Sequence, residues 1–154
     1  MTKVERSIII NATPEVVEEI HNDINRLTEW FAGVEKAVAD EIYPSAGGKV
    51  TLTYKTAGIT FEMTNTCLEY EYARYGRYKM EGMITGGYEE ISQPVEDGTR
   101  FTMNYDYQIP GGGLGKIVDR LFVEKMMVKD LETSLKNLKA LVEQEGGDKK
   151  SVKI

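Results

Sequence analysis

The sequence predicts one α+β domain in which a curved antiparallel sheet of about seven strands wraps around a long C-terminal helix. Two hydrophobic patterns support this prediction. Between residues 34 and 108, apolar and polar residues alternate, as in a sheet that is covered on one face only. After Pro110-Gly111-Gly112-Gly113 the period becomes that of an amphipathic helix, which continues to Val142.

The segments before the alternating region predict a first strand and two short helices. Residues 4–10 are rich in β-branched side chains and end at Asn11. Thr13 and Pro14 then match a helix N-cap followed by proline at the first helical position. A second short helix is expected over residues 25–31, with Gly33 at its end.

The alternating region predicts six further strands, separated by turns at hairpin spacing. Glycines inside these strands are expected where a strand bends or bulges. The turn signals are Gly47-Gly48, Ala57-Gly58, residues 71–74, Gly82 and Asp97-Gly98, and the glycines within strands are Gly76, Gly86 and Gly87.

The final helix is expected to cover about thirty residues from Leu114 and to end at Gly146-Gly147. No internal repeat and no linker rich in proline, glycine or serine divides the chain. We therefore expect a single domain over residues 1–145, followed by a flexible C-terminal tail over residues 146–154.

The composition excludes several classes of protein. The formal net charge of −6 and a pI near 5.0, without clustered Lys and Arg, argue against nucleic-acid binding. Cys67 is the only cysteine, so no internal disulfide can form. The sequence shows no signal peptide and no apolar run of roughly 18 residues. We expect a cytoplasmic protein, a monomer or weak dimer without integral membrane association.

The predicted architecture implies an internal space. One helix is roughly 10–12 Å across, whereas seven strands spaced about 4.8 Å apart span much more. The sheet must therefore curl around the helix. Large, soft side chains face the enclosed space, where they either fill the core or line a cavity. The predicted ligand-binding residues are Trp30, Tyr54, Phe61, Met63, Asn65, Tyr78, Met80, Tyr88, Glu90, Met103, Tyr105, Val118, Phe122 and Met126.

The junctions between the predicted elements resemble those of one known superfamily. The matching segments are Ala12-Thr13-Pro14-Glu15-Val16-Val17, Trp30-Phe31, Gly98-Thr99-Arg100-Phe101-Thr102, Pro110-Gly111-Gly112 and Leu135-Lys136-Asn137-Leu138-Lys139. In this order, from Val4 to about Leu141, they resemble the START-like (SRPBCC, helix-grip) superfamily, close to the polyketide cyclase/dehydrase and lipid-transport group.

The resemblance implies a helix-grip fold with a cavity for a hydrophobic ligand. Members of this superfamily are lipid carriers, hormone or flavonoid binders, aromatic polyketide cyclases, or chaperone activators. The resemblance implies no catalytic residues, because no catalytic set is invariant across the superfamily.

Glu90 is the main candidate for acid–base chemistry. If Tyr88 faces inward, strand parity places Glu90 inward and Glu89 in water. A carboxylate in an apolar cavity has a raised pKa and can act as an acid or a base. A rim position in water is the favoured alternative for Glu90. The same parity places Arg77 and Arg100 outside.

The sequence predicts no metal site and no cofactor. His21 is the only histidine, and no cysteine or carboxylate cluster accompanies it at ligand spacing. A Cys–His pair would require His21 to lie near Cys67, which instead has the pattern of a small buried hydrophobic residue.

Three functions agree with the sequence. The first is binding or carriage of a hydrophobic small molecule, lipid- or polyketide-like, and it is favoured because few ionisable groups face inward. The second is a polyketide cyclase or dehydratase, for which Glu90, Asn65 and the tyrosines are the only candidate groups. The third is an interaction module, such as a chaperone cofactor, which would need an exposed apolar patch of a few hundred Å². The sequence therefore favours a binder over an enzyme.

Overall fold

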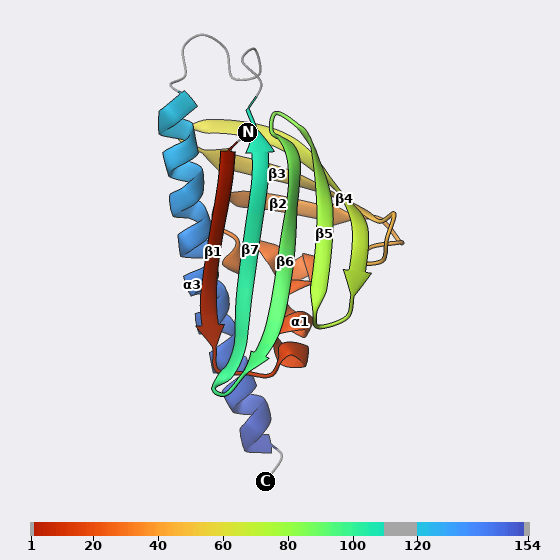
Figure 1. Cartoon of the computed structure of the whole chain (residues 1–154), viewed down its shortest axis with the longest axis vertical. Helices are drawn as coiled ribbons and strands as arrows, with labels where there is room; N and C mark the ends of the chain where they lie inside the picture. The colour runs from red at the N-terminus through yellow and green to blue at the C-terminus, as the bar shows by residue number, and fades with distance from the viewer. Residues whose placement is uncertain (1, 110–119, 153–154) are drawn as a thin grey trace.

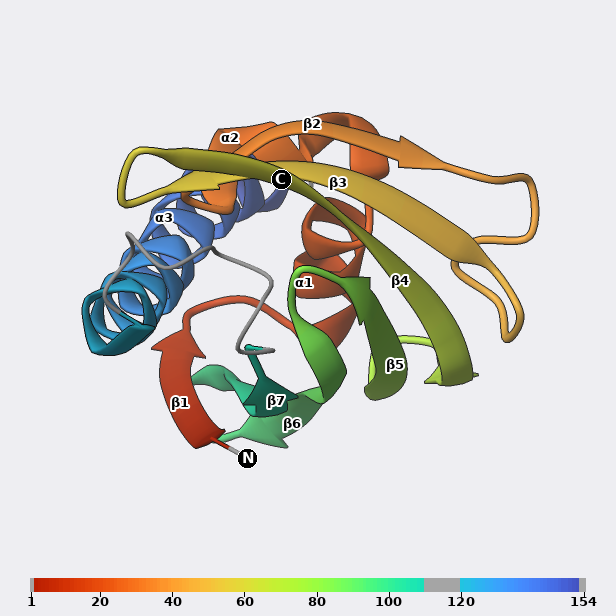
Figure 2. The same ribbon diagram turned by 90° about the horizontal axis from the view of Figure 1, so that it is seen from above.

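A curved sheet wraps around one long helix (Figures 1 and 2). The computed structural model describes residues 2–109 and 120–152. The elements in chain order are β1 (Thr2–Ile10), α1 (Pro14–His21), the 3-10 turn η1 (Ile24–Arg26), α2 (Leu27–Trp30), β2 (Val34–Ala39), β3 (Lys49–Thr56), β4 (Ile59–Glu71), β5 (Tyr75–Gly82), β6 (Thr85–Val95), β7 (Gly98–Gln108) and α3 (Arg120–Val152). This order confirms the predicted fold.

The seven strands form one antiparallel sheet in the order β1-β7-β6-β5-β4-β3-β2. The first strand therefore pairs with the last one, and every other pair is a hairpin between neighbours in the chain. Figure 2 shows the sheet curling so strongly that α3 contacts β1 at one edge and β3 near the other edge. The helices α1 and α2 also contact α3 and close one end of the curl.

The two short helices begin close to the predicted positions. Oγ1 of Thr13 accepts a hydrogen bond from the amide of Val16 at 3.4 Å, and Pro14 is the first residue of α1. The single helix expected over residues 25–31 is instead the 3-10 turn η1 followed by the short α2. Asp23 caps this turn through the amide of Asn25 at 3.1 Å, which favours a start earlier than predicted.

Two glycines are required by close approaches in the sheet. Gly86 has a φ of +125°, and a Cβ there would lie 2.2 Å from the carbonyl oxygen of Asp106 on β7. A Cβ on Gly76 would lie 2.9 Å from the ring of Tyr78. Gly86 therefore permits the tight pairing of β6 with β7, and Gly76 leaves room for an aromatic ring on the inner face.

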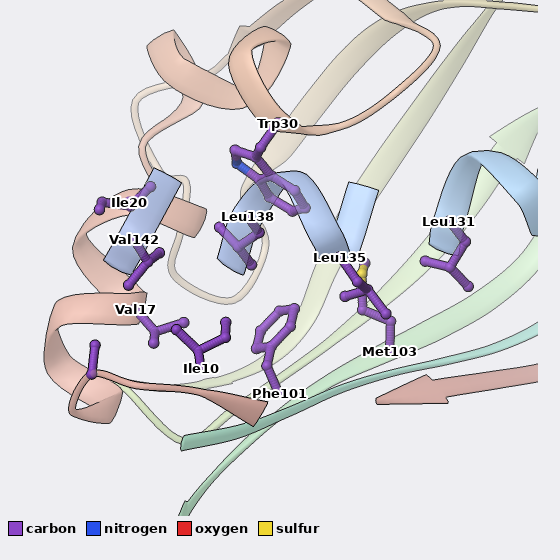
Figure 3. Packing of buried hydrophobic residues seen from close by; sticks show 11 residues of the cluster. Ile10, Val17, Ile20, Trp30, Phe101, Met103, Leu131, Leu135, Leu138 and Val142 are labelled. Atoms are coloured by element: carbon purple, nitrogen blue, oxygen red, sulfur yellow. The ribbon is translucent and has the colours of Figure 1, made fainter. Parts of the chain in front are cut away.

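The core has two adjoining parts on the concave side of the sheet. The first part gathers side chains from β1, α1, α2, β7 and α3 (Figure 3). The second part lies under the other half of the sheet, where β3, β4 and β5 meet the start of α3. The first part contains Ile10, Val17, Ile20, Trp30, Phe101, Met103, Leu131, Leu135, Leu138 and Val142, and the second contains Leu52, Tyr54, Phe61, Met63, Met80, Ile84, Tyr107 and Val123.

The long helix α3 is held by polar contacts as well as by its apolar face. Ser134 Oγ accepts a hydrogen bond from the amide of Ala32 at 2.8 Å. Asn137 Nδ2 donates to the carbonyl oxygen of Trp30 at 3.2 Å. These contacts join α3 to α2 and to the segment that precedes β2. No helix within residues 2–109 and 120–152 is both long and apolar enough to cross a membrane.

The end of α3 differs from the prediction. The helix runs through Gly146 and Gly147 to Val152, so the predicted stop at this pair is wrong. A glycine costs about 1 kcal/mol in a helix, but it keeps its amide N–H and does not break the hydrogen-bond ladder as proline does. The predicted turn at residues 110–113 and the predicted helix start at Leu114 lie outside the described residues.

Candidate functional site

An internal cavity lies between the concave face of the sheet and α3. It has two adjoining lobes, each with a volume of about 60 Å³. A water molecule needs roughly 10–15 Å³ on this scale, so each lobe has room for a few waters. Both lobes are lined by Phe31, Tyr54, Met63, Met80 and Tyr105.

The lobe beside α3, here called the helix lobe, is almost entirely apolar. Met127, Val128 and Leu131 of α3 form one wall. Ile84 and Tyr107 lie across from them on the sheet side. The Tyr107 hydroxyl is buried and has no hydrogen-bond partner among the described residues.

The second lobe, here called the polar lobe, extends toward α1 and carries the polar groups of the cavity. Asn65, Tyr88 and Glu90 line it from the sheet, and His21 lines it from α1. Asn65 is 4% exposed, and its Nδ2 donates to the Tyr88 hydroxyl at 3.2 Å. Its Oδ1 is buried without a partner in the described part of the chain. The polar lobe therefore offers hydrogen-bonding atoms at one end of an apolar space.

Three tyrosines form a stack across the inner face of the sheet. The rings of Tyr78 and Tyr105 lie on either side of the Tyr88 ring, each with centroids 4.9 Å away and interplanar angles of 13° and 21°. They occupy directly paired positions on β5, β6 and β7. Burial, and then the charge of Glu90, raise the pKa of all three phenols well above the usual value, so they stay neutral.

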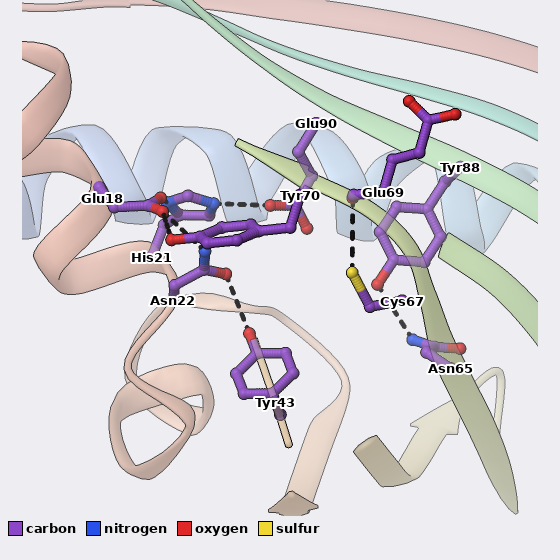
Figure 4. Close-up of polar contacts among 10 residues, drawn as sticks. All are labelled: Glu18, His21, Asn22, Tyr43, Asn65, Cys67, Glu69, Tyr70, Tyr88 and Glu90. Atoms are coloured by element: carbon purple, nitrogen blue, oxygen red, sulfur yellow. Dashed lines mark hydrogen bonds and ion pairs between the residues drawn. The ribbon is translucent and has the colours of Figure 1, made fainter. Parts of the chain in front are cut away.

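A buried cluster of Glu18, His21 and Glu90 forms the polar end of the cavity (Figure 4). His21 Nε2 lies 2.6 Å from Oε2 of Glu90, and Nδ1 lies 3.2 Å from Oε2 of Glu18. The contact between His21 and Glu18 is short enough for an ion pair but lacks the geometry of a hydrogen bond. The side chains of Glu18 and His21 are each 5% exposed and that of Glu90 is 12% exposed. Glu90 therefore faces inward, and the rim position favoured by the sequence is wrong.

The cluster also borders a second, smaller pocket on its far side. This outer pocket has a volume of about 10 Å³, enough for one water, and Glu18, His21 and Glu90 all line it. Glu18 Oε1 accepts hydrogen bonds from the Tyr70 hydroxyl and from Asn22 Nδ2. The cluster thus separates the polar lobe from a pocket that exposed side chains such as Arg74 also line.

The carboxylates around His21 control its protonation. Burial by itself lowers the pKa of the imidazole, but Glu90 and then Glu18 raise it, and the net result is a raised pKa. The imidazolium is therefore favoured at neutral pH. The ring of His21 also contacts Phe101 edge-on, with centroids 4.9 Å apart.

Asp130 joins α3 to the wall of the cavity. Its Oδ2 accepts hydrogen bonds from the Tyr54 hydroxyl at 2.7 Å and from Thr56 Oγ1 at 2.9 Å. Both donors lie on β3, and the ring of Tyr54 lines both lobes. This contact fixes the Tyr54 ring and holds α3 against the far half of the sheet.

Strand parity placed most of the predicted ligand-binding residues correctly around the cavity. Phe61 is buried, but its ring packs against Tyr54 at a centroid distance of 5.4 Å and does not line either lobe. Tyr78 lies behind Tyr88 and borders the outer pocket. The predicted residues that line the cavity are Trp30, Tyr54, Met63, Asn65, Met80, Tyr88, Glu90, Met103 and Tyr105. That they bind a ligand stays a prediction.

The side of α3 that faces the cavity differs from the predicted side. Phe122 is 51% exposed, and Met126 lines neither lobe, so both expected wall positions are wrong. Val118 lies outside the described residues. Residues 121–123 and 126–128 place apolar side chains on every side of the helix, so the sequence of this segment does not determine which side is buried. Counting back from the buried Leu131 and Leu135 by 3.6 residues per turn selects Met127 instead.

The cluster around His21 was missed because it joins distant elements. Glu18 and His21 are three residues apart on α1, which places them on one face of the helix. The alternation along the strand allowed Glu90 to face inward, but its contact with α1 depends on the tertiary fold and has no local sequence signal. The described residues contain no group of three or more His, Cys, Asp or Glu side chains arranged to hold a metal ion.

A protein family matches almost the whole chain. The model of a family described as "Polyketide cyclase / dehydrase and lipid transport" matches residues 1–143. The chain belongs to this family. The match includes all seven strands, the cluster of Glu18, His21 and Glu90, and every described residue that lines the cavity.

Solved structures of similar fold agree with this family. The Zhui aromatase/cyclase from Streptomyces sp. R1128 has a TM-score of 0.79 at 18% identity, with 93% of this chain and 94% of that chain covered. Protein TTHA0849 from Thermus thermophilus has a TM-score of 0.74 at 21% identity, covering 92% and 97%. The di-domain aromatase/cyclase StfQ of the steffimycin biosynthetic pathway has a TM-score of 0.71 at 16% identity, covering 94% and 52%.

These identities are low, so the structural likeness shows the fold and not the activity. No curated protein sequence matches the chain. The comparisons therefore show membership of the polyketide cyclase/dehydrase and lipid-transport family and a helix-grip fold.

Proposed function

We propose that the protein binds or carries an apolar small molecule, polyketide- or lipid-like, in the cavity beneath α3. The observation that carries this proposal is the two-lobed cavity lined by methionine and aromatic side chains, with polar atoms gathered at one end. Such a lining is typical of small-molecule sites, which are mostly apolar with a few placed polar groups. Each lobe is smaller than such sites, which enclose roughly 300–1,000 Å³, so a ligand must widen the space. The family description supports the same function.

The ligand is expected to have an apolar body and a hydrogen-bonding group near one end. Asn65 Oδ1, in the polar lobe, is buried without a partner among the described residues. A buried polar atom without a partner costs about 1–3 kcal/mol. A ligand hydroxyl that donates to Asn65 Oδ1 removes this cost, so a hydroxylated aromatic compound suits the polar lobe better than a plain hydrocarbon.

The lining side chains allow the cavity to enlarge around a ligand. Met63 and Met80 line both lobes, and Met127 lines the helix lobe. Methionine is unbranched and changes rotamer at low cost, so it adapts to ligands of different shape. Movement of these side chains joins the two lobes into one larger site.

The proposal predicts binding of a neutral fluorescent probe. N-phenyl-1-naphthylamine is expected to gain fluorescence with the protein, because it leaves water for the cavity. Met63→Trp places a larger side chain between the lobes and is expected to weaken binding at least about tenfold, a loss of about 1.4 kcal/mol. A fluorescence titration measures both affinities.

Two further variants separate blocked binding from a damaged fold. Leu68→Trp adds the same side chain on β4 at a position that is 40% exposed, and it is expected to leave the affinity unchanged. Met63→Ala enlarges the cavity and is expected to retain binding. Equal affinity in wild type and Met63→Trp, or no probe binding by any of these proteins, would overturn the proposal.

A cyclase- or dehydratase-type enzyme is the second candidate. The observation that favours it is the position of Glu90, whose carboxylate lies inside the cavity beside His21. The names of the similar aromatase/cyclase structures support the same candidate. The interaction module receives less support, since the large apolar side chains exposed in the described residues are spread over β1, β2, β4, α3 and two loops.

A further inference from the structure

We propose that Glu90, His21 and Glu18 form a proton-transfer site, in which Glu90 removes and returns a proton at the carbon next to the carbonyl group of an apolar ketone. The geometry places Glu90 and His21 between the polar lobe and the outer pocket, since both line the two spaces, and places Glu18 at the outer pocket in contact with His21. This assignment rests on the proposed function, because it requires a ligand in the cavity.

The burial of three ionisable side chains needs an explanation that packing does not supply. Buried ion pairs contribute little to stability, and apolar residues of similar size often replace them without loss. A buried ionisable group with a perturbed pKa that lines a cavity, as His21 does, is therefore a candidate for a functional site. Here two carboxylates flank one imidazole, so the cluster has proton donors and acceptors in sequence from the polar lobe to the outer pocket (Figure 4).

The carboxylate of Glu90 is the group that faces the ligand. Its Oε2 is occupied by His21 Nε2, whereas Oε1 makes no hydrogen bond within the described residues. Tyr88 lies two residues earlier on the same face of β6, roughly 6.7 Å away along the strand. The Tyr88 hydroxyl accepts from Asn65 Nδ2, so its own proton remains available as a donor. The proposal therefore assigns the ketone oxygen to Tyr88 and the neighbouring carbon to Glu90.

The chemical step needs no other reactant. A carbon–hydrogen bond next to the carbonyl breaks, the proton moves to the Glu90 carboxylate, and the electron pair forms an enolate on the ligand oxygen. The Tyr88 hydroxyl donates a hydrogen bond to this oxygen where the charge develops. Return of a proton from Glu90 to carbon regenerates the ketone, so nothing is consumed.

Glu90 itself lines the outer pocket, and the other two members of the cluster give its proton a second route to that pocket. Protons exchange between Glu90 and His21 Nε2, and between His21 Nδ1 and Glu18, whose carboxylate borders the outer pocket. The second transfer requires a small rotation of the Glu18 carboxylate, because the present 3.2 Å contact lacks hydrogen-bond geometry. His21 and Glu18 are therefore positioning and relay residues, and Glu90 is the catalytic residue.

Deuterium exchange of 2-tetralone in heavy water tests the site. Proton NMR follows the loss of the ketone's proton signal at carbon 1. Each protein is used at a concentration high enough to bind nearly all of the ketone. Wild type is expected to accelerate exchange at least about 100-fold over buffer at the same pH, the usual contribution of a positioned base. Glu90→Gln is expected to bring the rate within about tenfold of buffer.

Matched variants distinguish the base from the relay and from general damage. Glu89→Gln changes the neighbouring carboxylate, which points outward to Tyr75 and Asn104, and is expected to exchange like wild type. Glu18→Gln keeps the base but is expected to slow exchange several-fold and to shift its pH profile. Binding of 2-tetralone without faster exchange, or equal rates for wild type and Glu90→Gln, would overturn this assignment alone. If 2-tetralone does not bind, the assignment of an apolar ketone as the ligand is overturned. Binding of N-phenyl-1-naphthylamine tests separately whether the cavity takes up an apolar molecule.

Discussion

Phe101→Ala is expected to lower the free energy of unfolding by about 3–5 kcal/mol, the range for a buried phenylalanine replaced by alanine. Phe101 is 0% exposed and lies on β7 in the part of the core that joins α1, α2 and α3. Its ring also contacts the His21 ring. Alanine leaves a void between the sheet and the helices that these elements cannot close independently. Urea denaturation followed by circular dichroism measures the change.

Phe122→Ala is the matched control for this prediction. The same side chain is removed, but Phe122 is 51% exposed at the start of α3. The expected loss is therefore below about 1 kcal/mol, since exposed positions contribute little. Similar losses for the two variants would contradict the described placement of the core.

Glu90→Gln is expected to lower the free energy of unfolding by about 3 kcal/mol near neutral pH, because it removes one partner of a buried ion pair. The loss is at the lower end for such pairs, since His21 can give up its proton once Glu90 is neutralised. Glu89→Gln on the same strand is expected to cost less than about 1 kcal/mol. Denaturation at several pH values measures both effects.

The pH dependence provides a separate test of the same pair. The raised pKa of His21 means that the folded protein keeps its proton above about pH 6.5, where the unfolded chain loses it. Stability is then full below pH 6.5 and falls as pH rises toward the folded pKa, by at most about 1.4 kcal/mol per pH unit.

His21 is the only histidine, so no other imidazole contributes to this fall in stability. The groups that face it are Glu18 from α1 and Glu90 from β6. In Glu90→Gln the decline above pH 6.5 is expected to flatten, because the larger of the two carboxylate effects that raise the pKa is gone. A wild-type stability that rises as pH approaches 6.5 from below and is flat above it would show that His21 is buried as the neutral imidazole.

The sheet and its inner face followed from the sequence because strands have a fixed period. One apolar face must be covered, so alternation of residues alone assigned Tyr54, Met63 and Met103 to the cavity side. The bulge between Cys67 and Glu69 on β4 was not predicted. It reverses the parity of the last residues of β4, and this reversal lets Tyr70 reach Glu18 across the inner side.

The polar end of the site and the phase of α3 could not be predicted from local patterns. The pairing of His21 with Glu90 joins residues 69 positions apart and depends on how α1 sits in the curl of the sheet. Apolar residues at the start of α3 occur on every side of the helix, so only its packing distinguishes Met127 from Phe122 as a wall residue. Periodicity identifies a helix in such a segment but not the face that it buries.

NMR of protein labelled with carbon-13 on its methionine methyl groups tests most directly whether the space beneath α3 takes up an apolar molecule. On titration with N-phenyl-1-naphthylamine, we expect the methyl signals of Met63 and Met80 to shift, because both residues line both lobes. The signal of Met126, which lines neither lobe, is expected to stay in place. Met63 and Met80 signals that remain unchanged at saturating probe would contradict the account.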